Sequence, residues 1–302
     1  MNLLFDILWT VLLPIFLMIG AGAVLARCFR LDADTMGKLN LYVFTPALVF
    51  VKFTESGLAA SDMGTIALYW TCLVGVLLAV SAVVCRLAGV RDTDRPTVAI
   101  GSAFTNSGNF GIPAAQLAFG AAGAAVQAVI LAMENLLFFT LGLLLASGWR
   151  SGPRETIRTL ARQPVLWAIP AALLLRGHAD LIPAPFSVAV STLGAGLVPL
   201  ALVTLGTQLV GARHGSSGPA LPMIVGIRLV AAPIVGLVLV HLFSIQAPVA
   251  GMLVTAAGYP CAVNSVILAI EFKRSPALAS ASVFWTTLGA AVTVTAVLAA
   301  VR

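Results

Sequence analysis

Two stretches of the chain place asparagine, glycine and proline inside apolar segments, where polar side chains could bind a substrate. The first reads T-N-S-G-N-F-G-I-P at residues 105–113, and the second reads G-Y-P-C-A-V-N at residues 258–264. Asparagine amides offer hydrogen-bond donors and acceptors without a buried charge, although they could instead only satisfy loose backbone groups. The candidate substrate-binding residues are Asn106, Gly108, Asn109, Gly111, Pro113, Tyr259, Pro260 and Asn264.

Three charged residues also fall in or beside apolar segments. An ionised Glu134 in hydrocarbon would cost several kcal/mol, so it must face the interior, pair, or carry a proton. Proton coupling is one hypothesis, and a structural carboxyl group held by hydrogen bonds, with neighbouring Asn135 as a candidate partner, is the alternative. Arg228 is expected to extend its side chain to the cytoplasmic face, and a role as the cation for an anionic substrate is the alternative. Glu271 is expected at the same interface, as an anchor or gate.

The composition assigns the chain to the integral membrane proteins. Hydrophobic residues make up 60% of the chain and charged residues only 9%, against about 25% charged in globular domains. The net charge of +6 comes from basic residues in short gaps between apolar runs, which argues against a nucleic-acid partner.

The four cysteines have no metal-ligand spacing, and no hydrolase, P-loop or dinucleotide motif occurs, so neither a metal site nor an enzyme is predicted.

Ten apolar segments can be separated by charge and by Gly/Pro clusters, and the pattern predicts ten transmembrane helices. The second segment is short and carries Pro46, which predicts a kink or tilt there. The segments span residues 3–26, 38–53, 63–88, 96–117, 121–147, 161–178, 184–211, 219–242, 247–271 and 276–301.

Loop charge predicts the orientation of these segments. Even-numbered loops contain only Lys52 and Arg176, and by the positive-inside rule the basic odd-numbered loops are cytoplasmic. Both termini are therefore expected outside the cytoplasm, in a multi-pass protein of the inner (plasma) membrane. The odd-numbered loops contain Arg27, Arg30, Lys38, Arg86, Arg91, Arg95, Arg150, Arg154, Arg158, Arg162, Arg213, Lys273 and Arg274.

A basic cytoplasmic linker at residues 148–160 divides the chain into two five-helix halves, residues 1–147 and 161–302. An odd number of helices per half predicts two repeats of opposite orientation, as in many secondary transporters. Corresponding features support the repeat, because Gly-x-Pro occurs in the fourth segment of each half and a proline in the second segment of each half, at Pro46 and Pro199.

The two Gly-x-Pro motifs predict that the fourth and ninth helices are broken near the membrane centre. Proline lacks an N–H and its ring clashes with the preceding turn, and non-helical backbone at that depth must lie against protein or a watery cavity. Pro113 and Pro260 are each expected at the first position of a new half-helix, with Asn106 and Asn109 on the approach to the first break and Asn264 one turn beyond the second. The N-terminal ends of two antiparallel half-helices would then meet at one site suited to an anion.

The motifs N-S-G-N-F-G-I-P, Y-P-C-A-V-N-S-V-I-L-A-I-E-F-K-R-S-P, Y-V-F-T-P-A-L-V-F and R-L-V-A-A-P resemble the auxin efflux carrier family of permeases, within the bile-acid-symporter-like superfamily. The resemblance implies an X-shaped crossing of helices four and nine, an elevator-like mobile domain, a scaffold of helices one, two, six and seven, a homodimer, and organic-anion substrates. Plant carriers have valine-like residues where Asn264 stands and a further proline where Ser265 stands, so a bacterial permease fits better than an auxin carrier.

The sequence therefore predicts an all-α membrane protein of two inverted five-helix repeats that transports a small mono- or dicarboxylate. No cofactor is expected, and a proton or sodium ion is the candidate coupling ion. A passive channel or facilitator and a membrane ligand sensor remain as alternative functions. The expected partners are the organic anion, the lipid bilayer and a second copy of the chain.

Overall fold

The computed structural model describes residues 3–29, 31–55, 57–148, 152–210 and 218–301. These residues are almost entirely helical and contain no strand, only one isolated bridge between Thr105 and Cys261. The residues left undescribed include Arg150 in the predicted linker and Arg213 in the seventh loop. Within the described part, six helices are long and apolar enough to cross a bilayer: Leu3–Cys28, Ala60–Leu87, Ser107–Ser147, Ala184–Val210, Ala220–Leu242 and Pro276–Val301. The chain is a multi-pass, all-helical membrane protein.

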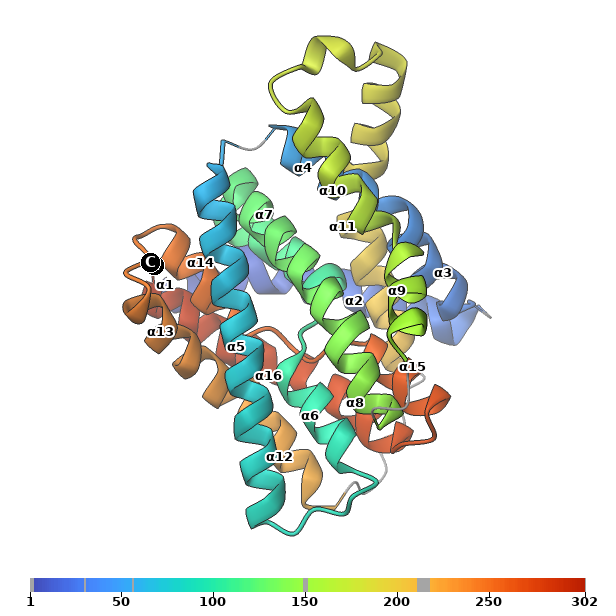
Figure 1. Cartoon of the computed structure of the whole chain (residues 1–302), viewed down its shortest axis with the longest axis vertical. Helices are drawn as coiled ribbons and strands as arrows, with labels where there is room; N and C mark the ends of the chain where they lie inside the picture. Colours follow the sequence, from blue (N-terminus) through green and yellow to red (C-terminus); the bar gives the residue numbers. More distant parts are fainter. Residues whose placement is uncertain (1–2, 30, 56, 149–151, 211–217, 302) are drawn as a thin grey trace.

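The first half of the chain contains helices of very different length (Figure 1). Several join end to end through π-helical turns, which carry the labels η1 to η4, so that one long helix contains two or more labelled elements. In chain order these elements are α1 (Leu3–Ile7), η1 (Leu8–Leu12), α2 (Leu13–Cys28), α3 (Ala33–Leu39), η2 (Asn40–Phe44), α4 (Thr45–Glu55), α5 (Ala60–Leu87), α6 (Arg95–Ala103), η3 (Ser107–Gly111), α7 (Ile112–Leu137), η4 (Phe138–Gly142) and α8 (Leu143–Ser147).

A short helix in the linker, α9 (Pro153–Ala161), leads into the second half. The elements that follow are α10 (Pro164–Leu175), the 3₁₀ turn η5 (Ala179–Leu181), α11 (Ala184–Val210), α12 (Ala220–Gly226), the π-helical turn η6 (Ile227–Ala231), α13 (Ala232–Leu242), α14 (Val249–Ala257), α15 (Asn264–Glu271) and α16 (Pro276–Val301).

Four of the π-helical turns are explained by proline. Pro14, Pro46, Pro113 and Pro233 each stand two residues after such a turn. Proline cannot donate to the carbonyl four residues back, and its ring clashes with that group. Widening the preceding turn, as where the Ile112 N–H donates to the Ser107 carbonyl five residues back, lets the helix continue through the proline. The irregularity predicted at Pro46 is therefore a π-helical turn inside one continuous helix.

Gly120 divides α7 into two helical pieces. Its backbone angles, φ 66° and ψ −150°, are non-helical and favour glycine, and no atom lies within 4 Å of where a Cβ would stand. This residue falls in the gap predicted between the segments 96–117 and 121–147. The 41-residue apolar stretch Ser107–Ser147 is thus interrupted where the sequence predicts a loop.

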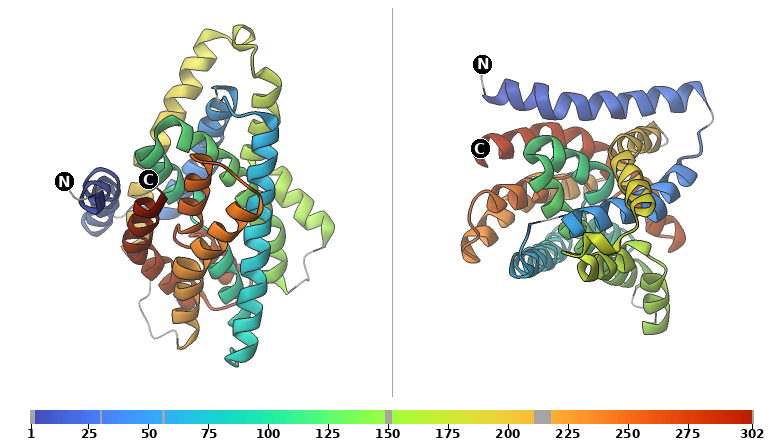
Figure 2. Two further views of the ribbon diagram at one scale, coloured as in Figure 1. Left: turned by 90° about the vertical axis from the view of Figure 1, so that its left-hand side faces the viewer. Right: turned by 90° about the horizontal axis from the view of Figure 1, so that it is seen from above.

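The helices pack in two groups. In the first, α11 packs against α2 and α4, and α4 also packs against α10. In the second, α5 contacts α6, α7 and α13, while α14 lies against α7 and α16. The N-terminal and C-terminal helices lie side by side, as Figure 2 shows from above, so the two ends of the chain join the groups at one edge.

Small residues allow α2 and α11 to approach closely. A Cβ on Gly22 would stand 2.1 Å from the carbonyl oxygen of Val203, and one on Gly206 would stand 2.0 Å from that of Ile19. Glycine at such contacts brings helix backbones together in membranes, where van der Waals packing drives association. The α2–α11 contact therefore depends on these two positions.

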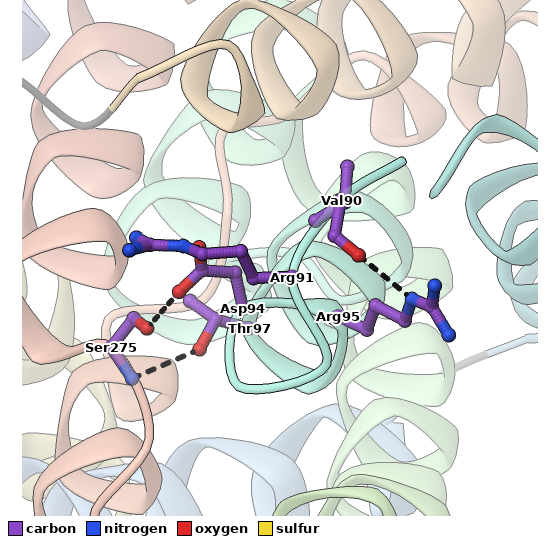
Figure 3. A network of polar contacts seen from close by, with 6 residues as sticks. All are labelled: Val90, Arg91, Asp94, Arg95, Thr97 and Ser275. Atoms are coloured by element: carbon purple, nitrogen blue, oxygen red, sulfur yellow. Dashed lines mark hydrogen bonds and ion pairs between the residues drawn. The ribbon is translucent and has the colours of Figure 1, made fainter. Parts of the chain in front are cut away.

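A polar network ties the start of α6 to the start of α16 (Figure 3). The Ser275 hydroxyl donates to the Asp94 carboxylate, and the Ser275 N–H donates to the Thr97 hydroxyl at 3.4 Å. Arg91 Nε lies 3.0 Å from the second Asp94 oxygen, while Arg95 Nε donates to the Val90 carbonyl at 3.0 Å. The network joins two loops that the charge pattern assigns to the cytoplasm.

We expect Gly22→Ala to lower the melting temperature of the purified protein, because overpacking at a backbone contact costs about 1–3 kcal/mol. Gly20→Ala on the same helix is the matched control, since nothing lies within 4 Å of its Cβ position. Thermal unfolding in detergent measures both. Equal melting temperatures for the two variants would contradict the tight α2–α11 contact.

Candidate functional site

Two breaks in the helices meet at one point inside the molecule. The first, Phe104–Asn106, follows α6, and the second, residues 258–263, separates α14 from α15. The Asn106 N–H donates to the Pro260 carbonyl at 2.8 Å, and the Ala262 N–H donates to the Phe104 carbonyl at 3.0 Å. The two extended segments thus form a short antiparallel pair, which we call the crossover.

Neighbouring elements satisfy other backbone groups at the crossover. The Thr105 N–H donates to the Glu134 carboxylate, and the Cys261 N–H donates to the Thr286 hydroxyl at 3.1 Å. Unpaired backbone groups are costly at membrane depth, so irregular backbone persists there only with such partners. α7 and α16 therefore stabilise the breaks.

The prolines do not stand where the sequence predicted. Pro113 lies seven residues past Asn106, within a helical run that already begins at Ser107, because the π-helical turn η3 absorbs the proline. Pro260 lies in the extended segment, where its carbonyl pairs with Asn106, and α15 begins only at Asn264. The expectation that both prolines begin half-helices is wrong.

The asparagines also differ from their predicted places. Asn106 lies in the first break and caps the new helical run, where its side-chain oxygen accepts the Asn109 N–H at 3.2 Å. Asn109 is in the first turn after the break rather than on the approach to it, and Asn264 begins α15 rather than lying one turn beyond its start.

Arg228 binds the C-terminal ends of both first half-helices. Its side chain is fully buried, with 0% exposure, and Nη1 donates at 3.1 Å to each of the Ser102 and Ala103 carbonyls that end α6. Nη2 donates to the Ala257 carbonyl that ends α14. Two helix C-termini carry about −0.5 charge each, so one guanidinium offsets both. The expectation that Arg228 extends to the cytoplasmic face is wrong, because these carbonyls bind it at the crossover.

Glu134 is held in place by hydrogen bonds from two other elements. Its carboxylate, in a side chain only 4% exposed, accepts from Trp70 Nε1 at 2.6 Å, from the Thr105 N–H and from the Thr105 hydroxyl at 3.3 Å. Asn135, the partner considered from sequence, has a buried side-chain nitrogen without a hydrogen bond. α5 and the first break therefore orient this carboxylate.

A cavity of about 380 Å³ lies against the crossover. Five of the sequence candidates line it: Asn106, Gly108, Asn109, Glu134 and Asn264. Both helical runs that leave the crossover, at Ser107 and at Asn264, begin in its wall, so the N-terminal ends of both runs lie at the cavity. Their partial positive charges suit an anion.

The remaining candidates shape the crossover without lining the cavity. Gly111 is needed for close approach, since a Cβ there would stand 2.6 Å from Gln127 Nε2 and 3.2 Å from the Tyr259 ring. Tyr259 packs edge-on against Phe110, with ring centroids 5.5 Å apart. Pro113 and Pro260 are absent from the lining as well.

The cavity also contains polar residues that sequence inspection missed. Their side chains come from segment two, from the start of α10, from α7 and from the end of α11, and no motif marks them in the sequence. Polar residues at predicted helix ends carry too weak a signal to separate from ordinary interfacial residues. Asn40, Gln163 and Gln208 were missed altogether, and Asn135 was expected only as a partner of Glu134.

Exposed residues of α3 and of the end of α15 line one side of the cavity, so we assign its mouth to this side; these two helices and α9 lie on the right in Figure 1. Asp34 and Lys38 of α3, Thr159 of α9 and Glu271 at the end of α15 line it there. These positions belong to the loops that the charge pattern assigns to the cytoplasm. Glu271 thus stands at the mouth, away from the crossover.

Comparison with known proteins agrees with this architecture. Residues 153–298 match the family described as membrane transport protein. The second half of the chain thus resembles this family. The transporter is also 26% identical over 264 residues to an uncharacterized transporter of Methanothermobacter thermautotrophicus, with 85% of each chain covered. The resemblance to auxin efflux carrier permeases is confirmed, and both matches indicate a membrane transporter.

We expect Arg228→Met to destabilise the transporter, because a similar volume remains while three buried carbonyls lose their donor. Each unsatisfied group costs about 1–3 kcal/mol. Arg86→Met, at an exposed position near the end of α5, is the control and should change the melting temperature little. If the two variants melt alike in detergent, Arg228 does not hold the crossover together.

Proposed function

We propose that the transporter is a secondary carrier for a small organic anion, a mono- or dicarboxylate, which binds in the cavity at the crossover. The observation that carries the proposal is that two helical runs begin in the wall of one cavity. Each N-terminus carries about half a positive charge, and helix N-termini bind anions without a buried cation.

Charge distribution across the crossover supports an anionic ligand further. Arg228 offsets the negative C-termini of α6 and α14, so these ends do not repel an anion. The cavity wall then adds amide groups from Asn106, Asn109 and Asn264. Amides at this depth bind an anion by hydrogen bonds without permanent charge, so the ligand can also leave.

The proposed mechanism is alternating access of the elevator type between two inverted five-helix repeats. Packing supports it, because α2, α4, α10 and α11 form one group and the crossover belongs to the other. The cavity lies between them, with Asn40 and Thr45 on one wall and the crossover on the other. In this proposal the mouth faces the cytoplasm of an inner membrane, both termini lie outside, and the first group also forms the contact of a homodimer.

Uptake into proteoliposomes tests the proposal. Labelled mono- and dicarboxylates should enter saturably and show counterflow, and Asn109→Ala and Asn264→Ala should each lower uptake at least about tenfold, since a hydrogen bond to a charged group contributes about 1.5–3 kcal/mol. Gln246→Ala, in an exposed loop, should transport normally.

Three outcomes of this experiment separate the candidate functions. Flux that is linear in concentration and lacks counterflow would identify a passive channel or facilitator. Ligand-induced stabilisation without any flux would identify a membrane ligand sensor. Absence of both uptake and stabilisation with every organic acid would overturn the proposal.

Proton coupling through Glu134 is the second part of the proposal, because this buried carboxyl group lines the cavity and also binds the first break. Glu134→Gln keeps an oxygen for the Thr105 N–H but cannot exchange a proton. An imposed pH gradient should therefore drive uptake in the natural protein and not in the variant, while counterflow is still detected in both. A variant that still responds to the gradient would contradict proton coupling here.

A further inference from the structure

Asn40 presents a buried hydrogen-bond acceptor that no group of the described chain satisfies. The side chain is 3% exposed, and its Oδ1 atom has no partner. Buried polar atoms without partners are rare in native proteins, and each requires a specific explanation. Asn40 lines the cavity, so a ligand there could supply the missing donor.

Neighbouring bonds fix which end of the Asn40 amide faces the cavity. Its Nδ2 donates to the Thr204 hydroxyl oxygen at 3.0 Å, and that hydroxyl in turn donates to the Leu200 carbonyl at 2.7 Å. Because the single proton of Thr204 is used, this hydroxyl can only accept from Asn40. Rotating the amide would place oxygen against oxygen. The cavity therefore receives an acceptor from Asn40.

Asn106 presents the opposite group from the crossover. Its Oδ1 accepts the Asn109 N–H at 3.2 Å, which orients the amide, and its buried Nδ2 has no partner among the residues that the structure describes. The side chain is 6% exposed and lines the same cavity. One unpaired donor and one unpaired acceptor, each held in a known orientation, thus line one cavity from two helix groups.

Other acceptors in the cavity do not replace Asn40. The Glu134 carboxylate already accepts three hydrogen bonds from Trp70 and Thr105. Gln163 and Gln208 each have an unpaired side-chain oxygen, which makes the wall around Asn40 richer in acceptors. Asn40 differs from Gln163 and Gln208 because a neighbour fixes its orientation. That neighbour is the Thr204 hydroxyl, which donates its own proton to the Leu200 carbonyl.

We propose that Asn40 determines substrate specificity by accepting a hydrogen bond from the ligand. This inference rests on the proposed function. The carboxylate of the ligand binds at the crossover, with Asn106 Nδ2 and the helix N-termini, while a hydroxyl or N–H group elsewhere on the same molecule donates to Asn40 Oδ1. The substrates are carboxylates that also carry a hydrogen-bond donor, such as hydroxy acids. A carboxylate without a donor leaves Asn40 unpaired and binds more weakly.

Binding of matched acids to the purified full-length protein tests this inference. Isothermal titration calorimetry in detergent would compare potassium salts of propionate, lactate and 2-methoxypropionate, and of succinate and malate. The methoxy acid keeps the oxygen of lactate but lacks its proton. We expect lactate and malate to bind at least about tenfold more tightly than propionate and succinate, and the methoxy acid no more tightly than propionate.

Variants assign the preference to Asn40. In Asn40→Leu, and in the smaller Asn40→Ala, the ratio of lactate to propionate affinity should fall below about twofold, because lactate loses the acceptor for its hydroxyl group. Asn106→Leu is the comparison variant. It should weaken both acids together and leave their ratio unchanged, because its amide binds the carboxylate that they share.

The outcomes distinguish this inference from the proposed function. Equal affinity for both members of each pair, or a preference that survives in both Asn40 variants, would overturn the role of Asn40 while leaving carboxylate transport intact. Failure of the natural protein to bind any of the five acids would overturn the proposed function and this inference with it.

Discussion

The mutual pairing of two broken helices is the constraint on which the rest of the structure depends. Backbone groups at membrane depth need hydrogen-bond partners. Both α6 and α14 end there, so their last carbonyls have no donor within the helix, and the segments that follow are extended. The two segments pair with each other, and Arg228 binds the carbonyls of both helices. Neither break would be stable alone, because each supplies the partners that the other lacks.

This pairing also separates charge within the crossover. The negative helix ends face Arg228, whereas the helical runs that begin at Ser107 and Asn264 face the cavity. The same interactions that make the broken backbone tolerable therefore leave the positive ends of two helical runs at the cavity. In the proposed function, stability and anion binding depend on one arrangement, so a substitution at Arg228 affects both.

The π-helical turns reconcile proline with long membrane helices. Each of the four that precede a proline lets the helix continue, and η2 and η3 lie directly beside the cavity. A π-helical turn has one more residue than an α-helical turn, so the side chains that follow it point in a different direction around the helix. Such turns are frequent at functional sites. Asn40 is the first residue of η2. Proline here shapes the wall of the site while the breaks themselves fall elsewhere.

The sequence by itself determined the class of protein, the helical segments and the importance of residues 105–113 and 258–264, because hydropathy, loop charge and Gly-x-Pro spacing are local properties. It also identified Asn106, Asn109, Asn264 and Glu134, which all line the cavity. Only the tertiary structure decided where the helices break, since a proline can be absorbed by a widened turn when neighbouring helices stabilise it. It likewise decided the place of Arg228 and Asn40, because the partners of a buried polar group come from segments more than a hundred residues away.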